Sequence, residues 1–148
     1  MNGASQLTAI SIVGMGGLGK TTLAKKVFDN HGVKEHFHCC IWITVTESYN
    51  MEELLKGMTK QYYKVMGKTA PEEINKLQFD FTRWQTKRCV VVFDDVWNIE
   101  FWGTIKHVFT DNNEGSRIIA TTRNYNVASS CKKFSIVHIH EIHPLTPA

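Results

Sequence analysis

The chain has 148 residues, of which 43% are hydrophobic and 21% charged, a composition typical of one soluble globular domain and unlike that of disordered or collagen-like chains. The formal net charge is only +3 and the lysines and arginines are scattered, so nothing indicates nucleic-acid binding. The sequence has no secretory signal pattern and no run near the roughly 18 apolar residues that a membrane span needs, so we expect no membrane span.

Short apolar runs alternate with helix-length amphipathic segments along the chain. Strands are predicted at residues 9–13, 39–45, 89–93, 117–121 and 134–139. The run at 89–93 is continuous and β-branched, as expected for a central parallel strand with both faces covered.

Four segments between these runs carry apolar residues at helical spacing. The predicted buried faces are Leu23, Ala24, Val27 and Phe28; Leu54, Leu55, Met58, Tyr62 and Val65; Ile74, Leu77, Phe81 and Trp84, in a helix that opens at Pro71; and Trp102, Ile105, Val108 and Phe109. Strands that alternate with helices indicate parallel βαβ units. The prediction is a three-layer α/β sandwich of the P-loop NTPase type, with a mainly parallel five-stranded sheet in one domain over residues 1–148.

A glycine-rich segment follows the first predicted strand. Gly14, Gly19, Lys20 and Thr21 match the pattern GxxxxGK[ST] between a strand and a helix, and a chance match in such a chain is roughly 1 in 200. Glycines let successive backbone N–H groups surround an anion, and the helix N-terminus adds partial positive charge. We expect Lys20 to reach the β- and γ-phosphates and Thr21 to ligate Mg²⁺. The predicted phosphate-binding residues of this segment are Gly14, Met15, Gly16, Gly17, Leu18, Gly19, Lys20, Thr21 and Thr22.

Two acids follow the run at 89–93. A magnesium ion bound to phosphate needs a hard oxygen ligand at the carboxyl end of a neighbouring strand, and Asp94 is predicted to hold it. Asp95 is predicted to be catalytic, by orienting or deprotonating an attacking water. The alternative is that both acids only form a turn, which is less favoured behind a phosphate-binding loop.

Arg123 follows the predicted strand at 117–121. Its guanidinium is suited to bidentate sensing of a γ-phosphate, and the alternative is an ordinary surface arginine.

Cysteine, histidine and tryptophan residues have simpler interpretations. The cysteines, which show no CxxC spacing, are Cys39, Cys40, Cys89 and Cys131, and they predict buried, reduced thiols in an intracellular, cytoplasmic protein. The histidines at 36–38 and 138–143 match no zinc spacing and are interpreted as ordinary strand and loop residues. The tryptophans are expected to be core or interface anchors, and they are Trp42, Trp84, Trp97 and Trp102.

Four segments together resemble a known family. GMGGLGKTTLAKKVF, FHCCIWITVTESYNMEELL, CVVVFDDVWN and GSRIIATTRN are similar, in order, to the P-loop, first resistance, kinase-2 and TTR-type motifs of plant NB-ARC domains. These domains occur in nucleotide-binding leucine-rich-repeat disease-resistance proteins. Trp97, which closes the kinase-2 motif, resembles the coiled-coil class, and the resemblance covers about residues 7–146.

The resemblance implies a regulatory module of an intracellular immune receptor, off with ADP and on with ATP, with slow ATP hydrolysis as a reset. It implies that Lys20, Thr21, Asp94 and Arg123 have phosphate, Mg²⁺ and sensing roles and that Asp95 is the hydrolytic acid. The implied partners are the nucleotide, the helical, winged-helix and leucine-rich-repeat regions of a full-length receptor, and other copies in a nucleotide-dependent oligomer.

The family pattern also includes parts that this sequence lacks. Only 13 residues precede Gly14, and the chain ends before the GLPL motif and the three downstream regions, so it resembles an incomplete NB-ARC domain. We expect this fragment to bind nucleotide weakly and not to switch alone. The alternative is a small stand-alone P-loop ATPase or kinase, but a kinase usually has a lid with arginines, and residues 51–86 offer only Arg83.

Overall fold

The protein forms one parallel sheet with helices on both faces. The computed structural model describes residues 8–15, 19–45, 47–65, 67, 88–108, 116–133 and 136–143. The strands are β1 (Thr8–Val13), β2 (Cys39–Thr44), β3 (Cys89–Asp94), β4 (Arg117–Thr122) and β5 (Ile136–Glu141). The helices are α1 (Lys20–Asp29), α2 (His31–His36), α3 (Met51–Val65), α5 (Phe101–Val108), α6 (Tyr125–Ser129) and the 3₁₀ helix η3 (Ser130–Lys133).

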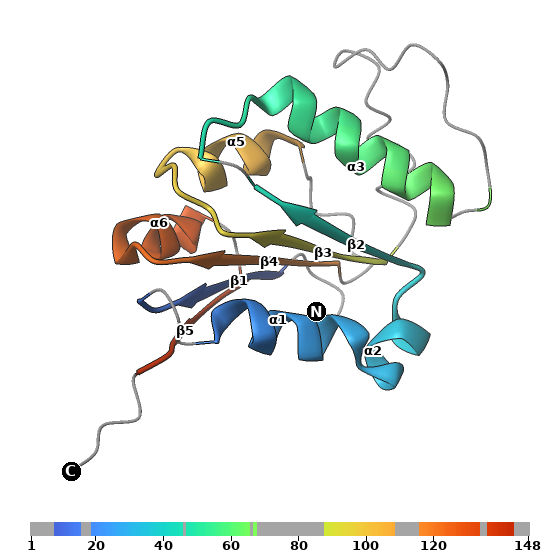
Figure 1. Ribbon diagram of the computed structural model, residues 1–148, viewed down its shortest axis with the longest axis horizontal. Coiled ribbons are helices and arrows are strands. Elements are labelled where there is room, and N and C mark those ends of the chain that lie inside the picture. The colour runs from blue at the N-terminus through green and yellow to red at the C-terminus, as the bar shows by residue number, and fades with distance from the viewer. Residues whose placement is uncertain are drawn as a thin grey trace.

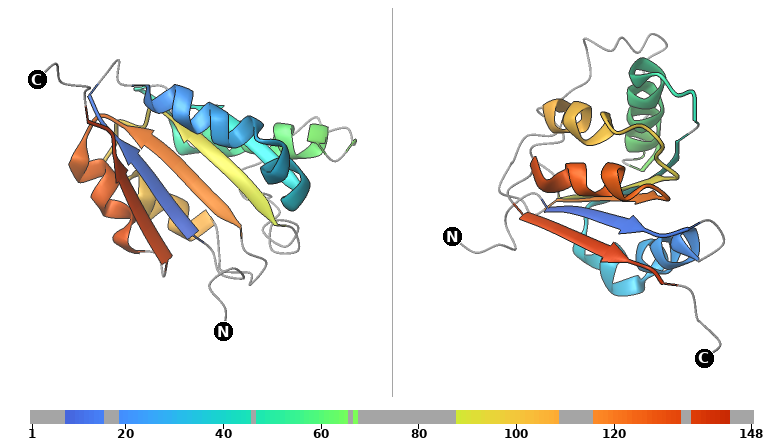
Figure 2. Two further views of the ribbon diagram at one scale, coloured as in Figure 1. Left: turned by 90° about the horizontal axis from the view of Figure 1, so that it is seen from below. Right: turned by 90° about the vertical axis from the view of Figure 1, so that its left-hand side faces the viewer.

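The spatial order of the strands is β2-β3-β4-β1-β5, and each neighbouring pair is parallel. Figure 1 shows α1 and α2 on one face of the sheet and α3, α5 and α6 on the other, and Figure 2 shows the same layers from two further sides. The predicted three-layer sandwich with a mainly parallel five-stranded sheet is confirmed.

Each face of the sheet has its own apolar core, because successive side chains of a strand point to opposite faces. Val91 and Phe93 of β3 pack with the fully buried Trp102 of α5, whereas Val90 and Val92 pack with α1. β3 is buried along its whole length, as its continuous apolar run predicts.

Two residues of the predicted helix faces are exposed, so those two predictions are wrong. Val27 is 37% exposed because the buried stripe of α1 is formed by Lys20, Ala24 and Phe28, each four residues apart. Val65 is 47% exposed because it lies at the carboxyl end of α3, three residues beyond the last buried residue of that helix. The predicted helix from Pro71 to Trp84, the side chain of Val108 and all of Phe109 lie outside the described residues.

Some element boundaries also differ from those predicted. α1 begins at Lys20, directly after Gly19 and three residues before Leu23, the first residue of its predicted apolar face. The last strand, β5, begins and ends two residues later than the predicted 134–139. The short helix α2 was not predicted. Its signal is Asn30, whose side chain accepts a hydrogen bond from the backbone N–H of Val33 at 3.1 Å and so caps the helix N-terminus.

The free edge of β2 is covered by a side chain. Gln61 of α3 donates its amide N–H to the carbonyl of Trp42 at 2.7 Å and accepts the Trp42 backbone N–H at 3.2 Å. Because β2 is an edge strand of the described sheet, these backbone groups have no strand beside them on that side among the described residues. Gln61 therefore takes the place of a sixth strand at this position.

The predicted burial is confirmed for three of the four cysteines. All four are free, and Cys39, Cys89 and Cys131 are buried, whereas Cys40 is half-buried, so the prediction is wrong for Cys40. Among the described residues, no helix is both long enough and apolar enough to cross a bilayer.

Candidate nucleotide-binding site

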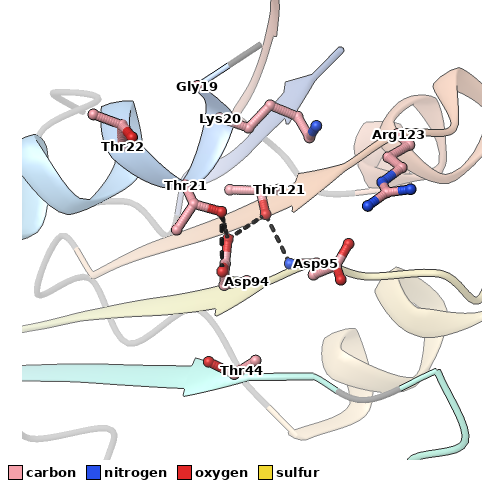
Figure 3. A pocket seen from close by; sticks show the side chains of 9 residues that line it. All are labelled: Gly19, Lys20, Thr21, Thr22, Thr44, Asp94, Asp95, Thr121 and Arg123. Atoms are coloured by element: carbon pink, nitrogen blue, oxygen red, sulfur yellow. Dashed lines mark hydrogen bonds between the residues drawn. The ribbon is translucent and has the colours of Figure 1, made fainter. Parts of the chain in front are cut away.

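A pocket of about 410 Å³ lies where the carboxyl ends of the strands meet the start of α1. Its lining residues, drawn in Figure 3, are Gly19, Lys20, Thr21, Thr22, Thr44, Asp94, Asp95, Thr121 and Arg123. Parallel strands place all their carboxyl ends at one edge of the sheet, which is where such folds bind ligands. The fold thus brings the glycine-rich segment, both acids and Arg123 together from three separate parts of the chain.

The glycine-rich segment is tied to the sheet on one side and to α1 on the other. Gly14 donates its backbone N–H to the carbonyl of Thr122 at 3.2 Å, and Gly19 accepts the Leu23 N–H at 2.8 Å as the first bond of α1. Gly19 has φ of +85°, in the left-handed region that glycine adopts most readily. Gly16, Gly17 and Leu18, predicted to bind phosphate, lie outside the described residues.

Lys20 is a largely buried cation at the start of α1, with only 7% of its surface exposed. Its Nζ donates a hydrogen bond to the carbonyl of Met15 at 3.0 Å, so the ammonium turns back over the glycine-rich segment. Burial lowers the pKa of Lys20 from the ordinary 10.5, and the positive charge of Arg123 lowers it further, while Asp95 and Asp94 oppose this change. A negatively charged ligand in the pocket would supply the missing counter-charge.

Asp94 lies at the end of β3 and accepts hydrogen bonds from two threonine hydroxyls. Thr21 donates to Oδ1 at 3.0 Å and to Oδ2 at 3.1 Å, and Thr121 of β4 donates to Oδ1 at 2.6 Å. Asp94 is 7% exposed, so these neutral donors hold a nearly buried carboxylate in one orientation. Thr21 and Asp94, each predicted to ligate Mg²⁺, therefore lie in direct contact.

Asp95 takes a different backbone conformation from its neighbour. Its φ of +67° is the only positive value at a non-glycine residue in the described part of the chain. The Asp95 backbone N–H donates to the Thr121 hydroxyl oxygen at 2.7 Å. In Figure 3 the Asp95 carboxylate points away from Thr21, to the side of the pocket where Arg123 lies.

Arg123 stacks on an exposed aromatic ring. Its guanidinium carbon lies 5.2 Å from the ring centroid of Trp97, which is 41% exposed. Both side chains also line a second pocket of about 480 Å³, which includes Met15 and Tyr125 and shares Asp95 with the first pocket. The side chain of Met15, predicted as a phosphate-binding residue, thus faces the second pocket, while its carbonyl contacts Lys20.

The sequence prediction missed two site residues, Thr44 and Thr121. Both are polar residues at the carboxyl ends of strands next to β3, and Thr44 pairs with Asp94 in register. That position was the available signal, but only the strand order shows that both strands flank β3. In the part of the chain that the structure describes, no group of three His, Cys, Asp or Glu side chains is placed to hold a metal ion.

Comparison with known proteins gives matches over nearly the whole chain. The NB-ARC domain model matches residues 1–147. The chain is 38% identical to disease resistance protein RPM1 of Arabidopsis thaliana over 130 residues, which cover 84% of this chain and 14% of that protein. It is 37% identical to disease resistance protein RPP13 of the same species over 128 residues, 80% of this chain and 15% of that protein. A putative disease resistance protein RGA4 of Solanum bulbocastanum is 33% identical over 149 residues, which cover 97% of this chain and 15% of that protein.

Solved structures share the fold at low sequence identity. Cdc6p from Pyrobaculum aerophilum superimposes with a TM-score of 0.66 at 13% identity, over 93% of this chain and 39% of that chain. A signal transduction ATPase with numerous domains (STAND) from Pyrococcus horikoshii gives a TM-score of 0.56 at 17% identity, over 95% of this chain and 21% of that chain. This chain therefore spans only a small part of the length of its relatives.

Proposed function

This chain belongs to the NB-ARC family, and on that premise we propose that it is the ADP/ATP-binding regulatory switch module of an intracellular plant immune receptor, off with ADP and on with ATP. The observation that carries the proposal is the convergence of Lys20, Thr21, Asp94 and Arg123 on one pocket at the carboxyl edge of the sheet. Lys20 and Arg123 offer cationic contacts to a nucleotide phosphate chain, and Thr21 and Asp94 offer oxygen ligands to a magnesium ion bound to that chain.

Lys20 is the main phosphate contact in this proposal. The Met15 carbonyl that accepts its hydrogen bond is a neutral partner, and a phosphate oxygen is a stronger, charged acceptor at the same ammonium. Gly19 places the N-terminus of α1 at the pocket, where unpaired backbone N–H groups favour an anion. Phosphate binding would also offset the repulsion between Lys20 and Arg123.

The residues around Asp94 fit a magnesium ion. A carboxylate and a hydroxyl are hard oxygen donors of the kind that Mg²⁺ prefers, and Thr21 and Asp94 already contact each other. Thr21 can bind a cation through an oxygen lone pair while its O–H still donates a hydrogen bond to Asp94. When bound, Mg²⁺ neutralises charge on the β- and γ-phosphates.

Arg123 and Asp95 act at the γ-phosphate end of the proposed site. The guanidinium of Arg123 distinguishes ATP from ADP through the additional phosphate, and Asp95 orients or deprotonates a water for slow hydrolysis. Both residues line the same side of the pocket and also the second pocket beside it.

The disease resistance relatives favour a switch module over a stand-alone ATPase or kinase. We propose that the partners in a full-length receptor are its own helical, winged-helix and leucine-rich-repeat regions, and other copies in a nucleotide-dependent oligomer. The proposed compartment is the cytoplasm. Sustained turnover on an added phosphoryl acceptor would instead favour the enzyme alternative.

Thermal unfolding of this chain with and without Mg-ADP and Mg-ATP tests the proposal. A ligand at about 100 times its dissociation constant stabilises the folded state by about 2.7 kcal/mol, which raises Tm by roughly 5–10 °C for a domain of this size. Lys20→Ala should abolish the rise. The matched control is Lys26→Ala, which removes an exposed lysine of the same helix and should leave the rise in Tm unchanged. Absence of a rise in the parent at millimolar nucleotide would refute nucleotide binding by this chain.

A further inference from the structure

We propose that Thr121 is a positioning residue that holds Asp94 and Asp95 in two different orientations, so that neighbouring acids serve different parts of the site. In naming Mg²⁺ as the ligand that benefits, this inference rests on the proposed function. Thr121 carries no predicted role in the sequence, and its hydroxyl is the one group that contacts both acids among the described residues.

The hydroxyl of Thr121 acts as donor and acceptor at once. It donates its proton to Asp94 Oδ1 at 2.6 Å and accepts the backbone N–H of Asp95 at 2.7 Å. The residue is 1% exposed, so neither bond competes with bulk solvent. Buried hydrogen bonds of this length hold their partners in one geometry.

The first bond orients the Asp94 carboxylate. Thr121 and Thr21 both donate to Oδ1, while among the described residues Oδ2 accepts only the longer, shared bond from Thr21. Oδ2 therefore retains lone pairs for a cation or its water. Outer partners of this kind typically change metal affinity about 10- to 100-fold when they are removed.

The second bond holds the backbone turn at Asp95. A positive φ is unfavourable for a residue with a side chain and persists only where the surroundings hold it. Two oxygens of Thr121 accept hydrogen bonds from consecutive backbone amides of this turn. The hydroxyl oxygen accepts the Asp95 N–H, and the carbonyl oxygen accepts the Val96 N–H at 2.8 Å. The turn sends the Asp95 carboxylate toward the Arg123 side of the pocket, as Figure 3 shows.

The next residue of the strand provides a matched control. Thr122 is also 1% exposed, but successive residues of a strand face opposite sides, and its hydroxyl donates to the Val96 carbonyl at 2.7 Å rather than to a carboxylate. Valine has nearly the shape of threonine without the hydroxyl. Thr121→Val and Thr122→Val therefore each remove one buried hydroxyl from β4, on opposite faces of the sheet.

Two measurements on the 148-residue chain test the proposal. The first is hydrogen exchange of the Asp95 amide by NMR without nucleotide, with the Val96 amide as internal reference. We expect exchange at Asp95 to become about tenfold faster in Thr121→Val, and to stay at the parent value in Thr121→Ser and Thr122→Val. The second is the ratio of the ADP dissociation constant in EDTA to that in Mg²⁺, by calorimetry. This ratio should fall about tenfold in Thr121→Val only.

The two measurements separate this proposal from the function on which it rests. Unchanged exchange at Asp95 in Thr121→Val, or an equal fall of the magnesium ratio in Thr122→Val, would overturn the positioning role. A parent chain that binds no ADP would refute the proposed function, and the exchange comparison would still decide whether Thr121 holds the turn.

Discussion

Replacing Gly19 with alanine tests the backbone geometry on which the candidate site depends. Gly19 has φ of +85°, and a Cβ built at this position meets no atom within 4 Å. The substitution therefore adds no steric clash, and its cost comes from the left-handed backbone alone. Because α1 begins with the bond from Leu23 N–H to the Gly19 carbonyl, relief of the strain would also shift the start of that helix.

The magnitude follows from two opposing effects. The left-handed backbone costs a residue with a side chain about 1–2 kcal/mol. Alanine also lowers the conformational entropy of the unfolded chain, which stabilises the folded state by about 0.4–1 kcal/mol. We expect Gly19→Ala to lower the free energy of unfolding by about 1 kcal/mol. It should also weaken ADP binding, because the glycine-rich segment, which is proposed to bind phosphate, must change shape.

Gly57 provides the same chemical change with the opposite expected sign. It lies inside α3, and an added Cβ would reach Ile43 Cδ1 at 3.8 Å, an ordinary van der Waals contact. Alanine is favoured over glycine in a helix by about 0.5–1 kcal/mol, so Gly57→Ala should stabilise the protein. Thermal unfolding should separate the two variants by about 3–8 °C, with the parent between them. If Gly19→Ala were as stable as the parent while Gly57→Ala was stabilised, the left-handed geometry at Gly19 would be refuted.

Three further predictions concern the site and the edge of the sheet. Trp97→Ala should lower the preference for ATP over ADP about two- to fivefold, because Arg123 loses an exposed cation–π contact worth about 0.5–1 kcal/mol. Trp97→Phe should retain part of that preference. An equal or higher preference in Trp97→Ala, measured by calorimetry, would contradict this prediction. ADP affinity in the absence of Mg²⁺ should fall as pH rises toward 10.5, starting below the pH at which an ordinary lysine titrates. The reason is that the protonated form of Lys20 is the one proposed to bind phosphate, and burial lowers the pKa of Lys20. Affinity that stays constant up to pH 10.5 would refute the proposed role of the ammonium. Gln61→Leu should lower the free energy of unfolding, measured by urea denaturation, by about 1–3 kcal/mol, because the backbone N–H and carbonyl of Trp42 at the sheet edge lose their hydrogen-bond partners. An unchanged urea midpoint would show that water replaces these two hydrogen bonds.

Local patterns in the sequence were enough to predict most of the fold. Continuous β-branched runs such as residues 89–93 identified the strands, and apolar residues at helical spacing identified α3. The predictions failed where burial depends on what covers an element. Val27 and Val65 fit their periodic patterns, but the sheet packs against a narrower stripe of α1 and a shorter length of α3 than the patterns cover.

For the candidate site, the sequence was enough to predict Lys20, Thr21, both acids and Arg123 as site residues, because a glycine-rich segment after a strand and a strand followed by acids are local patterns. That these residues line one pocket is known only from the folded structure. The strand order places β4 between β3 and β1, so the hydroxyl of Thr121 reaches Asp94 and Asp95 from a strand more than twenty residues away along the chain. Hydrogen bonds between distant strands depend on pairing and register, which are properties of the folded sheet and leave no pattern of their own in the sequence.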